Sequence, residues 1–410
     1  MDKTTILTEE ISKVNFRAFI WHGIFLSLAS NFMDVHTIIP SMLIKAGGGA
    51  ILLGMLTTIM VGGSSLMQIV FASFLSNRMH KKKPLIAAIS LRVITLLSLA
   101  LLLFKSDAIS NSLLILFIFI LISIFSFSGS FANISYVDIM GKSIIEKKRK
   151  QFFSIKQAIS SVGIFASAII VRSLLKRFEY PFNYGILLLS AGILLFIASW
   201  GFWKIKEVRV EIKKKHSFLE FFKMLPREIS QNANLKNYLF IINFLGLGFS
   251  FIPFMILFAK KNFELSADLI GNILLFKIIG MLITSLILYK RSNHFEYKKL
   301  LYFSFIVGAI LPILSLIFSN NYLMYQLIFV VSGVFITVFR IASNGILVEI
   351  SNNENRAVYT GISGAGSILP TIFPLVAGIL ISVMGYYATF IAVSFIITLS
   401  LIFIRKLECK

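Results

Sequence analysis

Twelve long apolar runs limit what this chain can fold into more than any other feature of the sequence. They cover residues 17–39, 50–76, 84–104, 111–137, 152–174, 182–203, 237–259, 267–289, 299–318, 322–347, 358–381 and 385–404. A bilayer core of about 30 Å is crossed by about 20 helical residues, because only a helix satisfies its own backbone hydrogen bonds there. The 410-residue chain is also 57% hydrophobic and only 14% charged. We therefore predict an all-α integral membrane protein with twelve transmembrane helices.

The segment before the first run argues against a cleaved signal peptide. It carries Asp2, Glu9 and Glu10, and no small-residue cleavage site follows the run. Signal peptides have a basic start and a shorter apolar region. We expect the first helix to be retained.

Basic residues gather in alternate loops, which predicts the orientation of the helices. The loops 77–84, 141–151, 203–216 and 289–299 are rich in Lys and Arg, whereas the intervening loops hold few of either. Because basic loops stay in the cytoplasm, we predict that both termini are cytoplasmic. The formal net charge of +22 then reflects loops that face an anionic inner leaflet, and no nucleic-acid motif is present to suggest such a partner.

The chain shows signs of an internal repeat. Its longest inner loop, 204–236, follows six predicted helices, so we expect an N-terminal six-helix bundle at 1–203 and a C-terminal one at 237–410. Within the halves, "ANISYVDI" (132–139) matches "SNGILVEI" (343–350), which aligns Asn133 with Asn344 and Asp138 with Glu349. Transporters are often built from such repeats.

This order of parts resembles the major facilitator superfamily over essentially the whole chain. The family carries a glycine-containing Asp-Arg motif with basic residues after the second helix, and "SFLSNRMHKKK" (73–83) retains Arg78 and the basic run Lys81 to Lys83. The resemblance implies two pseudo-symmetric six-helix bundles around a central cavity, and an inner-face charge relay. In that relay Arg78 would pair with Asp138, and Glu349 and Arg356 would be the counterparts in the second half. The alternative is that the basic run only anchors the loop at the membrane.

Three of the predicted helices carry polar stripes. Residues three or four apart share a helix face. The stripes comprise Ser27, Ser30, Asn31, Asp34 and Thr37 in helix 1, Ser123, Ser126, Ser130 and Asn133 in helix 4, and Gly333, Thr337, Arg340 and Asn344 in helix 10. By the resemblance, helices 1, 4, 7 and 10 line the central cavity. We therefore predict that Asn31, Asp34, Asn133, Thr337, Arg340 and Asn344 contact the substrate or the coupling ion.

Charged residues inside the runs are mostly basic. Lys277 lies near the middle of helix 8, where a lysine cannot reach either surface, so it either lines the transport path or pairs with Asp34. Arg92, Lys156 and Arg340 add further positive charge, whereas Asp34 is the one acid well inside a run. This bias favours an organic anion or zwitterion as substrate. Whether His22, His36 and Arg92 act in function or in packing is left open by the sequence.

The predicted function is secondary active transport by alternating access, with Asp34 as the proton carrier. No nucleotide-binding motif, paired carboxylates or hydrolase motif is present, so we expect no enzyme activity and no cofactor. The single cysteine, Cys409, cannot form an intrachain disulfide, and no metal site is predicted.

Two alternatives remain on the same scaffold. A drug–proton antiporter is disfavoured, because helix 5 lacks the Gly-Pro of that group. A lipid or lysolipid flippase would suit the phenylalanine-rich walls. We expect a monomer whose partners are a small-molecule substrate and the lipid bilayer, located in a bacterial inner membrane.

Overall fold

The computed structural model describes residues 7–63, 67, 71, 75, 80–208, 226, 228–290, 296–351, 359, 362–364 and 366–408. Throughout these residues the regular structure is helical, and no strand occurs among them. Ten segments are long and apolar enough to cross a membrane. One of these ten, the 45-residue segment Ile362–Lys406, covers the last two of the twelve predicted runs. A shorter apolar segment, Ala50–Gly63, corresponds to part of the second predicted run. The predicted all-α membrane fold is confirmed.

Two compact units divide the chain, and each is described separately. Unit 1 comprises residues 1–34 and 66–218, and unit 2 comprises residues 35–65 and 219–410. The division predicted from the sequence, with bundles at 1–203 and 237–410, stays a prediction. The compact units differ from it because residues 35–65 group with the C-terminal part of the chain.

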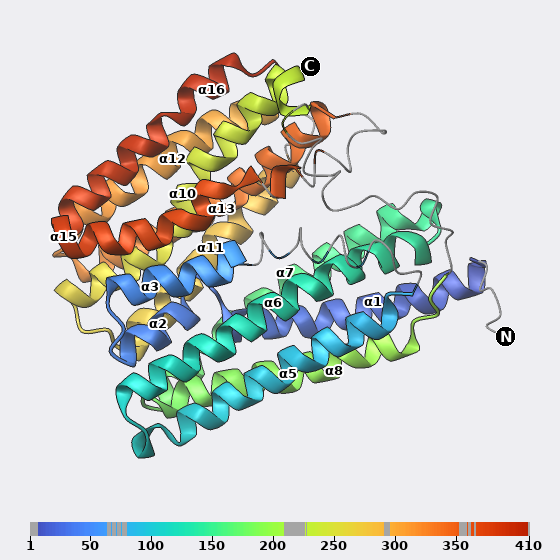
Figure 1. Cartoon of the computed structure of the whole chain (residues 1–410), viewed down its shortest axis with the longest axis horizontal. Coiled ribbons are helices and arrows are strands. Elements are labelled where there is room, and N and C mark those ends of the chain that lie inside the picture. The colour runs from blue at the N-terminus through green and yellow to red at the C-terminus, as the bar shows by residue number, and fades with distance from the viewer. Residues whose placement is uncertain are drawn as a thin grey trace. The chain divides into compact units, whose positions relative to one another are not determined.

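The described residues of unit 1 form five long helices: α1 (Glu9–Ser30), α5 (Lys82–Phe104), α6 (Asn111–Ser143), α7 (Glu146–Arg177) and α8 (Phe182–Lys204). Helix α5 packs against α6 and α8, and α1 packs against α7 and α8 (Figure 1). The side chain of Thr8 caps α1 by accepting the N–H of Ile11 at 3.2 Å, and Glu9 and Glu10 occupy the first turn, where acids favour the helix dipole. Local signals therefore explain where this helix begins.

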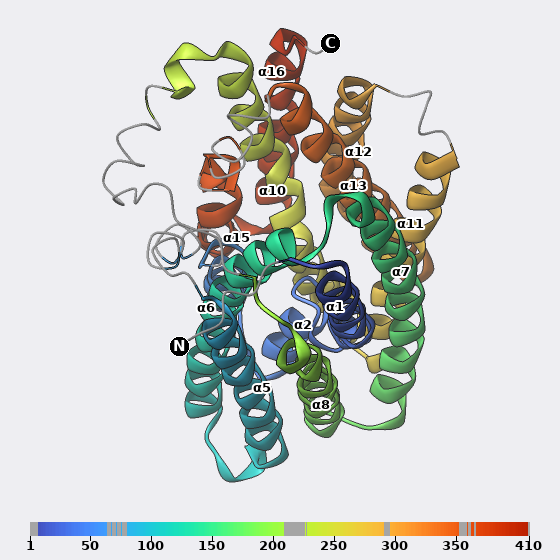
Figure 2. The same ribbon diagram turned by 90° about the vertical axis from the view of Figure 1, so that its right-hand side faces the viewer.

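Unit 2 contains α10 (Ala233–Asn262), α11 (Ala267–Lys290), α12 (Tyr297–Ile317), α13 (Tyr322–Glu349), α15 (Ile368–Thr398) and α16 (Ser400–Lys406), together with α2 (Ile38–Lys45) and α3 (Ala50–Thr57). Helix α13 packs against α11 and α12, and α15 packs against α10, α12 and α3 (Figure 2). Inside α15, Gly385 has a φ of 78°, a conformation that favours glycine. The predicted boundary between the last two runs, residues 381 to 385, falls at this kink.

The first and second predicted runs are interrupted. Helix α1 gives way to a 3-10 turn, η1 (Asn31–Met33), and Asp34 then adopts an extended conformation before α2 begins. Helix α3 continues as a π-helix, η2 (Thr58–Gly63). Both irregular stretches lie next to the points where the chain passes between the units, after Asp34 and after Ser65. The segment between them forms an α2–α3 hairpin, which belongs to unit 2.

Glycines bring α3 and η2 into backbone contact with α15. A Cβ atom at Gly54 would collide with the carbonyl of Pro374, one at Gly62 would collide with Thr371, and one at Gly378 would collide with the carbonyl of Ala50. In lipid, helices associate through close packing rather than through the hydrophobic effect. The glycines therefore provide the surface on which the α2–α3 hairpin docks.

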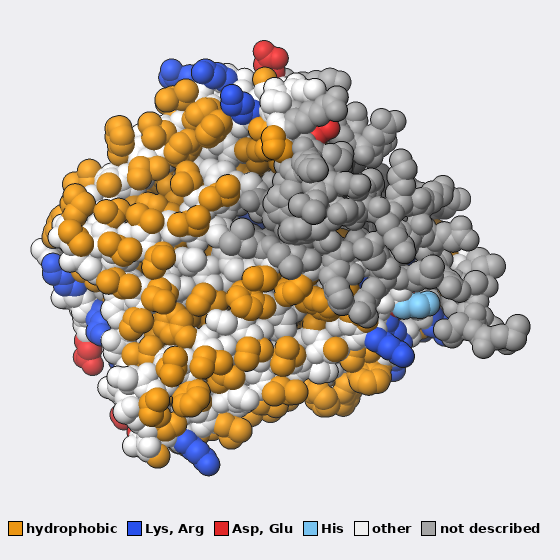
Figure 3. All heavy atoms as spheres, viewed as in Figure 1, with side chains coloured by type: hydrophobic (Ala, Val, Ile, Leu, Met, Phe, Trp, Pro, Cys, Tyr) orange, Lys and Arg blue, Asp and Glu red, His pale blue; other side chains and the backbone are white. Residues whose placement is uncertain are grey.

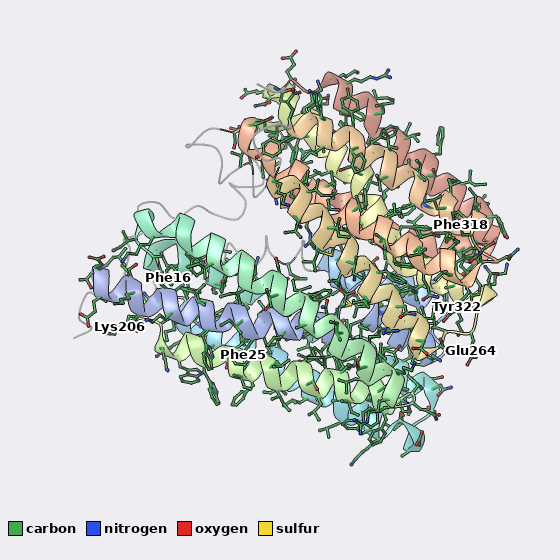
Figure 4. The ribbon with its side chains drawn as sticks, turned by 180° about the vertical axis from the view of Figure 1, so that it is seen from behind. Phe16, Phe25, Lys206, Glu264, Phe318 and Tyr322 are labelled. Carbon is green, nitrogen blue, oxygen red and sulfur yellow. The ribbon has the colours of Figure 1, made fainter. Side chains whose placement is uncertain are left out.

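Hydrogen bonds at the end of each unit reveal the internal repeat. In unit 1, the Asn15 amide donates to the Lys206 carbonyl at 2.9 Å and accepts the Lys206 N–H at 2.8 Å. Figure 4 places Lys206 beside the start of α1. In unit 2, Asn234 makes the same pair of bonds to Glu408, at 2.9 and 3.0 Å. We call these two arrangements the asparagine clamps.

Two lysines repeat in the same way. Lys82 Nζ, at the start of α5, donates to the carbonyls of Trp203 and Ile205 at 2.8 and 2.7 Å. Lys298 Nζ, near the start of α12, donates to the carbonyls of Arg405 and Leu407 at 3.5 and 2.5 Å. The sequence predicted a repeat from one short motif, and these bonds show equivalent contacts at the ends of both units.

The outer surface of the helices is apolar. Figure 3 shows hydrophobic side chains spread over the helices of both units on the face in view. The most exposed hydrophobic side chains of the described residues include Val162, Val383 and Leu101, which are 72%, 78% and 61% exposed. Exposed side chains of this size suit contact with lipid rather than water.

Candidate functional site

Asp34 lies at the interruption of the first predicted span. It caps the C-terminus of η1, and its ψ of 124° ends the helical conformation. Asn31, three residues earlier, is buried, and its amide donates to the carbonyl of Ile164 at 2.6 Å and to Ser167 Oγ at 2.9 Å. The Asn31 side chain therefore joins η1 to α7, while Asp34 is the last residue of the first segment of unit 1.

Lys277 is almost completely buried in unit 2. Lys277 lies in the middle of α11 and is 1% exposed. A Cβ at Gly333 of α13 would collide with the Lys277 carbonyl, and one at Gly280 would collide with the Val330 carbonyl. Thr337 Oγ1 donates to the Met281 carbonyl at 3.5 Å. The predicted residues Lys277 and Thr337 thus lie at one close crossing of α11 and α13.

Arg340 and His36 both lie against the aromatic ring of Phe249. The Arg340 guanidinium lies 5.5 Å from the Phe249 ring centroid, and the His36 ring meets Phe249 edge-on with centroids 4.3 Å apart. His36 is buried, whereas Arg340 is exposed. A guanidinium near an aromatic face gains a cation–π attraction. This contact fixes part of the Arg340 side chain and leaves the rest accessible.

The remaining predicted residues are more scattered. Asn133 and Asn344 are both exposed, on α6 and α13 respectively. Glu349 is partly exposed at the end of α13. Arg78 and Arg356, which we predict to act at the inner face, fall outside the described residues.

Asp138 is the centre of a charge network at one end of unit 1. Its carboxylate pairs with Lys81 Nζ at 2.9 Å and with Lys142 Nζ at 3.0 Å. Lys81 belongs to the basic run next to Arg78. Lys81 therefore joins the basic run to Asp138. The contact of Asp138 with Arg78 stays a prediction.

Glu207 completes this network, and sequence reasoning missed it. Its carboxylate accepts the backbone N–H of Lys81 at 2.8 Å and of Lys82 at 2.9 Å, and pairs with Lys142 at 2.9 Å. The first N–H groups of a helix have no partner within the helix, and they attract negative charge. Glu207 therefore caps α5 from a segment that follows α8. The only signal in the sequence was that Glu207 is one of two acids within the basic stretch 203–216.

Four polar side chains of unit 1 lie on α6 or contact it, and we call them the basic cluster: His22, Arg92, Tyr136 and Lys156. Lys156 Nζ donates to Tyr136 Oη at 2.9 Å and lies 4.9 Å from the centre of that ring. The His22 ring lies 5.4 Å from the Tyr136 ring and 4.3 Å from that of Phe202.

Arg92 reaches the basic cluster from α5. Its guanidinium lies 4.2 Å from the centre of the Phe125 ring, and a Cβ at Gly129 would approach it to 3.3 Å. Gly129 thus makes room for the guanidinium on α6. Among the described residues no carboxylate pairs with Arg92 or Lys156, and Arg92 Nε has no hydrogen-bond partner there. The cluster is therefore rich in donors and in positive charge.

A pocket of about 580 Å³ opens at the N-terminal end of α1 and α7 in unit 1. Phe16, labelled in Figure 4, contributes to its wall, together with Arg17, Lys148 and Ile155. Lys148 pairs with Glu9 at 2.9 Å across this pocket mouth. Ile155 of this pocket directly precedes Lys156 in α7.

Residues 238–408 match the sequence profile of the Major Facilitator Superfamily. No relative among curated protein sequences matches the chain. Solved structures with a similar fold include a mutant of the nucleoside transporter NupG, at a TM-score of 0.71 and 12% identity, covering 96% of this chain and 100% of that one. A POT family transporter in complex with a thioalcohol conjugated peptide reaches a TM-score of 0.67 at 13% identity, with 96% of each chain covered. A mutant of the peptide transporter POT reaches 0.68 at 11% identity, with 98% of each chain covered.

At these identities the solved structures report on the fold, whereas the profile match reports on the sequence of the C-terminal part. The two findings agree with each other and with the apolar helices described above. Residues 238–408 thus match the model of the Major Facilitator Superfamily, and 96% of the chain has a fold similar to that of a solved nucleoside transporter.

Proposed function

We propose that this protein is a secondary transporter that moves a small organic anion or zwitterion across a bacterial inner membrane by alternating access. The observation that carries the proposal is the sign of the charge inside its helices. Arg92 and Lys156 in unit 1 and Lys277 in unit 2 lie within long apolar helices. Interior positive charge attracts anions and repels cations.

The division into two units supports alternating access. Motion of one unit relative to the other would have to be absorbed where the chain passes between them, after Asp34, after Ser65 and after Phe218. The first of these points is not helical, which suits a hinge. Within unit 1, Glu207, Lys142 and Asp138 join α5, α6 and the segment after α8, so that these parts can move as one body. We propose that Arg78, Asp138, Glu349 and Arg356 act at the inner face during this motion.

Proton coupling is assigned to Asp34 in this proposal. An acid at a hinge can favour one state when charged and the other when protonated, because its interactions differ between the two states. Asn31, Asn133, Lys277, Thr337, Arg340 and Asn344 remain the proposed substrate contacts.

The first experiment is a ligand screen of the purified protein by thermal stability, since a ligand that binds the folded state raises its melting temperature. Organic anions, zwitterions, cationic drugs and lysolipids are compared. Stabilisation by an anion or zwitterion that weakens in Lys277→Ala supports the proposal. Stabilisation by cationic drugs alone would replace it with drug–proton antiport, and stabilisation by lysolipids alone would replace it with lipid flipping.

Coupling is tested in proteoliposomes with an imposed pH gradient. Asp34→Asn should abolish gradient-driven transport of the ligand found in the screen, while binding remains measurable. Asp107→Asn, which alters an exposed acid in the loop between α5 and α6, is the matched control and should transport normally. Gradient-driven transport that persists in Asp34→Asn would remove this residue from the coupling mechanism.

A further inference from the structure

The basic cluster of unit 1 offers donors and positive charge without a matching acceptor. Lys156 donates to Tyr136 Oη, which leaves the hydroxyl hydrogen of Tyr136 free to donate to another group. Arg92 Nε is enclosed and has no partner among the described residues. Buried donors without acceptors are costly, and the cost is removed when an anion accepts their hydrogen bonds.

The two cations lie along one face of α6. Arg92 rests on Phe125 and Gly129, and Lys156 binds Tyr136. Residues 129 and 136 are two helical turns apart, so they share a face and are separated by about 10 Å along the axis. Two long basic side chains that start this far apart can both reach an anionic group placed between them.

The stem of Lys156 is held in place by packing. A Cβ at Gly23 of α1 would lie 3.6 Å from Lys156 Cγ, so the stem crosses α1 at a glycine. The head then meets α6, and α1 itself packs on α7. Both Arg92 and Lys156 remain partly exposed, so that a ligand can reach them.

We propose that Arg92, Lys156 and Tyr136 form a subsite for a group with two negative charges, of the phosphate monoester class. Two cations with no carboxylate partner are neutralised by a dianion, whereas a monocarboxylate leaves one positive charge in a medium of low polarity. Charge-assisted hydrogen bonds from Arg, Lys and Tyr to phosphate oxygens are short and strong. This inference rests on the proposed transport of an anion and names the chemical class of that anion.

The test uses the purified full chain and four probes: phenyl phosphate, benzoate, phenol and a lysophosphatidate below its micelle concentration. Binding is measured by calorimetry and by thermal shift. Phenyl phosphate should bind at least 10-fold more tightly than benzoate, and phenol should not bind, because the three share a ring and differ in charge. If only lysophosphatidate binds, the phosphate group is that of a lipid; if phenyl phosphate binds too, a water-soluble ester suffices. Either result supports the subsite.

Variants then assign the residues. Lys156→Met and Arg92→Gln should each weaken phenyl phosphate binding by about 10- to 100-fold, the loss expected for one charge-assisted contact. Lys156→Arg should retain most of the affinity. The matched control is Lys299→Met, which removes a lysine that is 71% exposed and paired with Glu296. It should bind as the original chain does.

A readout without ligand separates a binding role from a structural one. Because Lys156 has no carboxylate partner among the described residues, Lys156→Met should leave the melting temperature unchanged or raise it. A large fall would indicate a structural role and would overturn the subsite. Unchanged phenyl phosphate binding in both Lys156→Met and Arg92→Gln would also overturn the subsite. In that case, transport of benzoate by the two variants would show that the proposed function still holds. If none of the four probes binds, the subsite is overturned, whereas the proposed function is still decided by the wider screen of organic anions and zwitterions.

Discussion

Glu207 shows how a single residue outside the spans can organise several helix ends. Its carboxylate is almost fully buried, accepts two backbone N–H groups of α5 and pairs with Lys142. Lys142 also pairs with Asp138, so that one chain of charges joins α5, α6 and the segment after α8. A surface ion pair contributes little to stability, but a buried carboxylate with this many partners contributes much more.

We expect Glu207→Gln to lower the stability of the protein by about 2 kcal/mol, because the amide accepts only one of the N–H groups and leaves Lys142 with less compensating charge. The measurement is the apparent melting temperature in detergent. Glu296→Gln, which alters a carboxylate that is 67% exposed, is the control and should melt with the original chain. Equal melting temperatures for all three proteins would show that the network does not stabilise unit 1.

For single residues, the sequence predicts which helices carry charged side chains better than it predicts which residues those side chains contact. Lys277, which the sequence places in the interior of an apolar run, is 1% exposed, and its predicted role in the transport path stays a prediction. Arg92, Lys156 and His22 were recognised one at a time, but their meeting in the basic cluster could not be foreseen. Helical periodicity gives the face of each residue on its own helix, and it does not say which helices lie next to one another. Glu207 was missed for the same reason, since its partners lie more than 60 residues away.

Among the helices, the contact of the α2–α3 hairpin with α15 depends on glycines. Gly54 of α3 and Gly378 of α15 each face the backbone of the other segment, where a Cβ has no space. Glycine within a helix is otherwise unfavourable by about 1 kcal/mol relative to alanine. The close approach therefore outweighs the intrinsic preference of the two helices.

Gly54→Ala and Gly378→Ala should each destabilise the protein by about 1 to 3 kcal/mol, the usual cost of overpacking a tight contact. Gly364→Ala is the matched control, because no atom lies within 4 Å of the Cβ it would gain. That variant should be neutral or slightly stabilising. Thermal unfolding in detergent distinguishes these results, and a rise in stability for Gly54→Ala would contradict the contact.

The asparagine clamps invite a comparison between equivalent positions. Asn15 is fully buried, whereas Asn234 is partly exposed, although both bind the backbone of the segment after the last helix of their unit. Water can replace a lost hydrogen bond at an exposed position but not at a buried one.

We therefore expect Asn15→Ala to cost about 2 kcal/mol and Asn234→Ala less than about 1 kcal/mol. Melting temperatures of the two variants and of the double variant measure this difference. The two effects should add, because the clamps lie in separate units and share no partner. A larger loss at Asn234 would show that burial does not decide the strength of the clamps.

For the whole molecule, the predicted topology can be tested through the single cysteine. Cys409 lies at the C-terminus, and Asp107 is exposed in the loop between α5 and α6. Because basic loops are retained in the cytoplasm, we expect Cys409 to be cytoplasmic and residue 107 to face outward.

A thiol reagent that cannot cross membranes should leave Cys409 unmodified in intact cells and should modify it after permeabilisation. Asp107→Cys in a Cys409→Ser background should react in intact cells. Labelling with the reverse pattern would invert the topology, and it would place the Glu207 network on the outer side.

At this scale the all-α membrane fold follows from the length of the apolar runs and is confirmed, with ten segments among the described residues that are long and apolar enough to cross a membrane. The interruptions in the first two runs were not foreseen, because Asp34 and the small residues at 62–65 are compatible with continuous helices. Local composition does not report that residues 35–65 pack against α15, a segment more than 300 residues further along.

Because the α2–α3 hairpin belongs to unit 2, it affects how two separately produced fragments of the chain would associate. A cut in the loop after α8 separates the gene into halves of similar size, but it does not separate the two compact units, because residues 35–65 pack with the C-terminal one. The N-terminal fragment would carry a hairpin whose glycine-matched partner is encoded on the other fragment, and the C-terminal fragment would leave the docking face of α15 uncovered. Two such fragments produced together should find each other through this exchanged hairpin, whereas each produced alone should be a substrate for the quality-control proteases of the membrane.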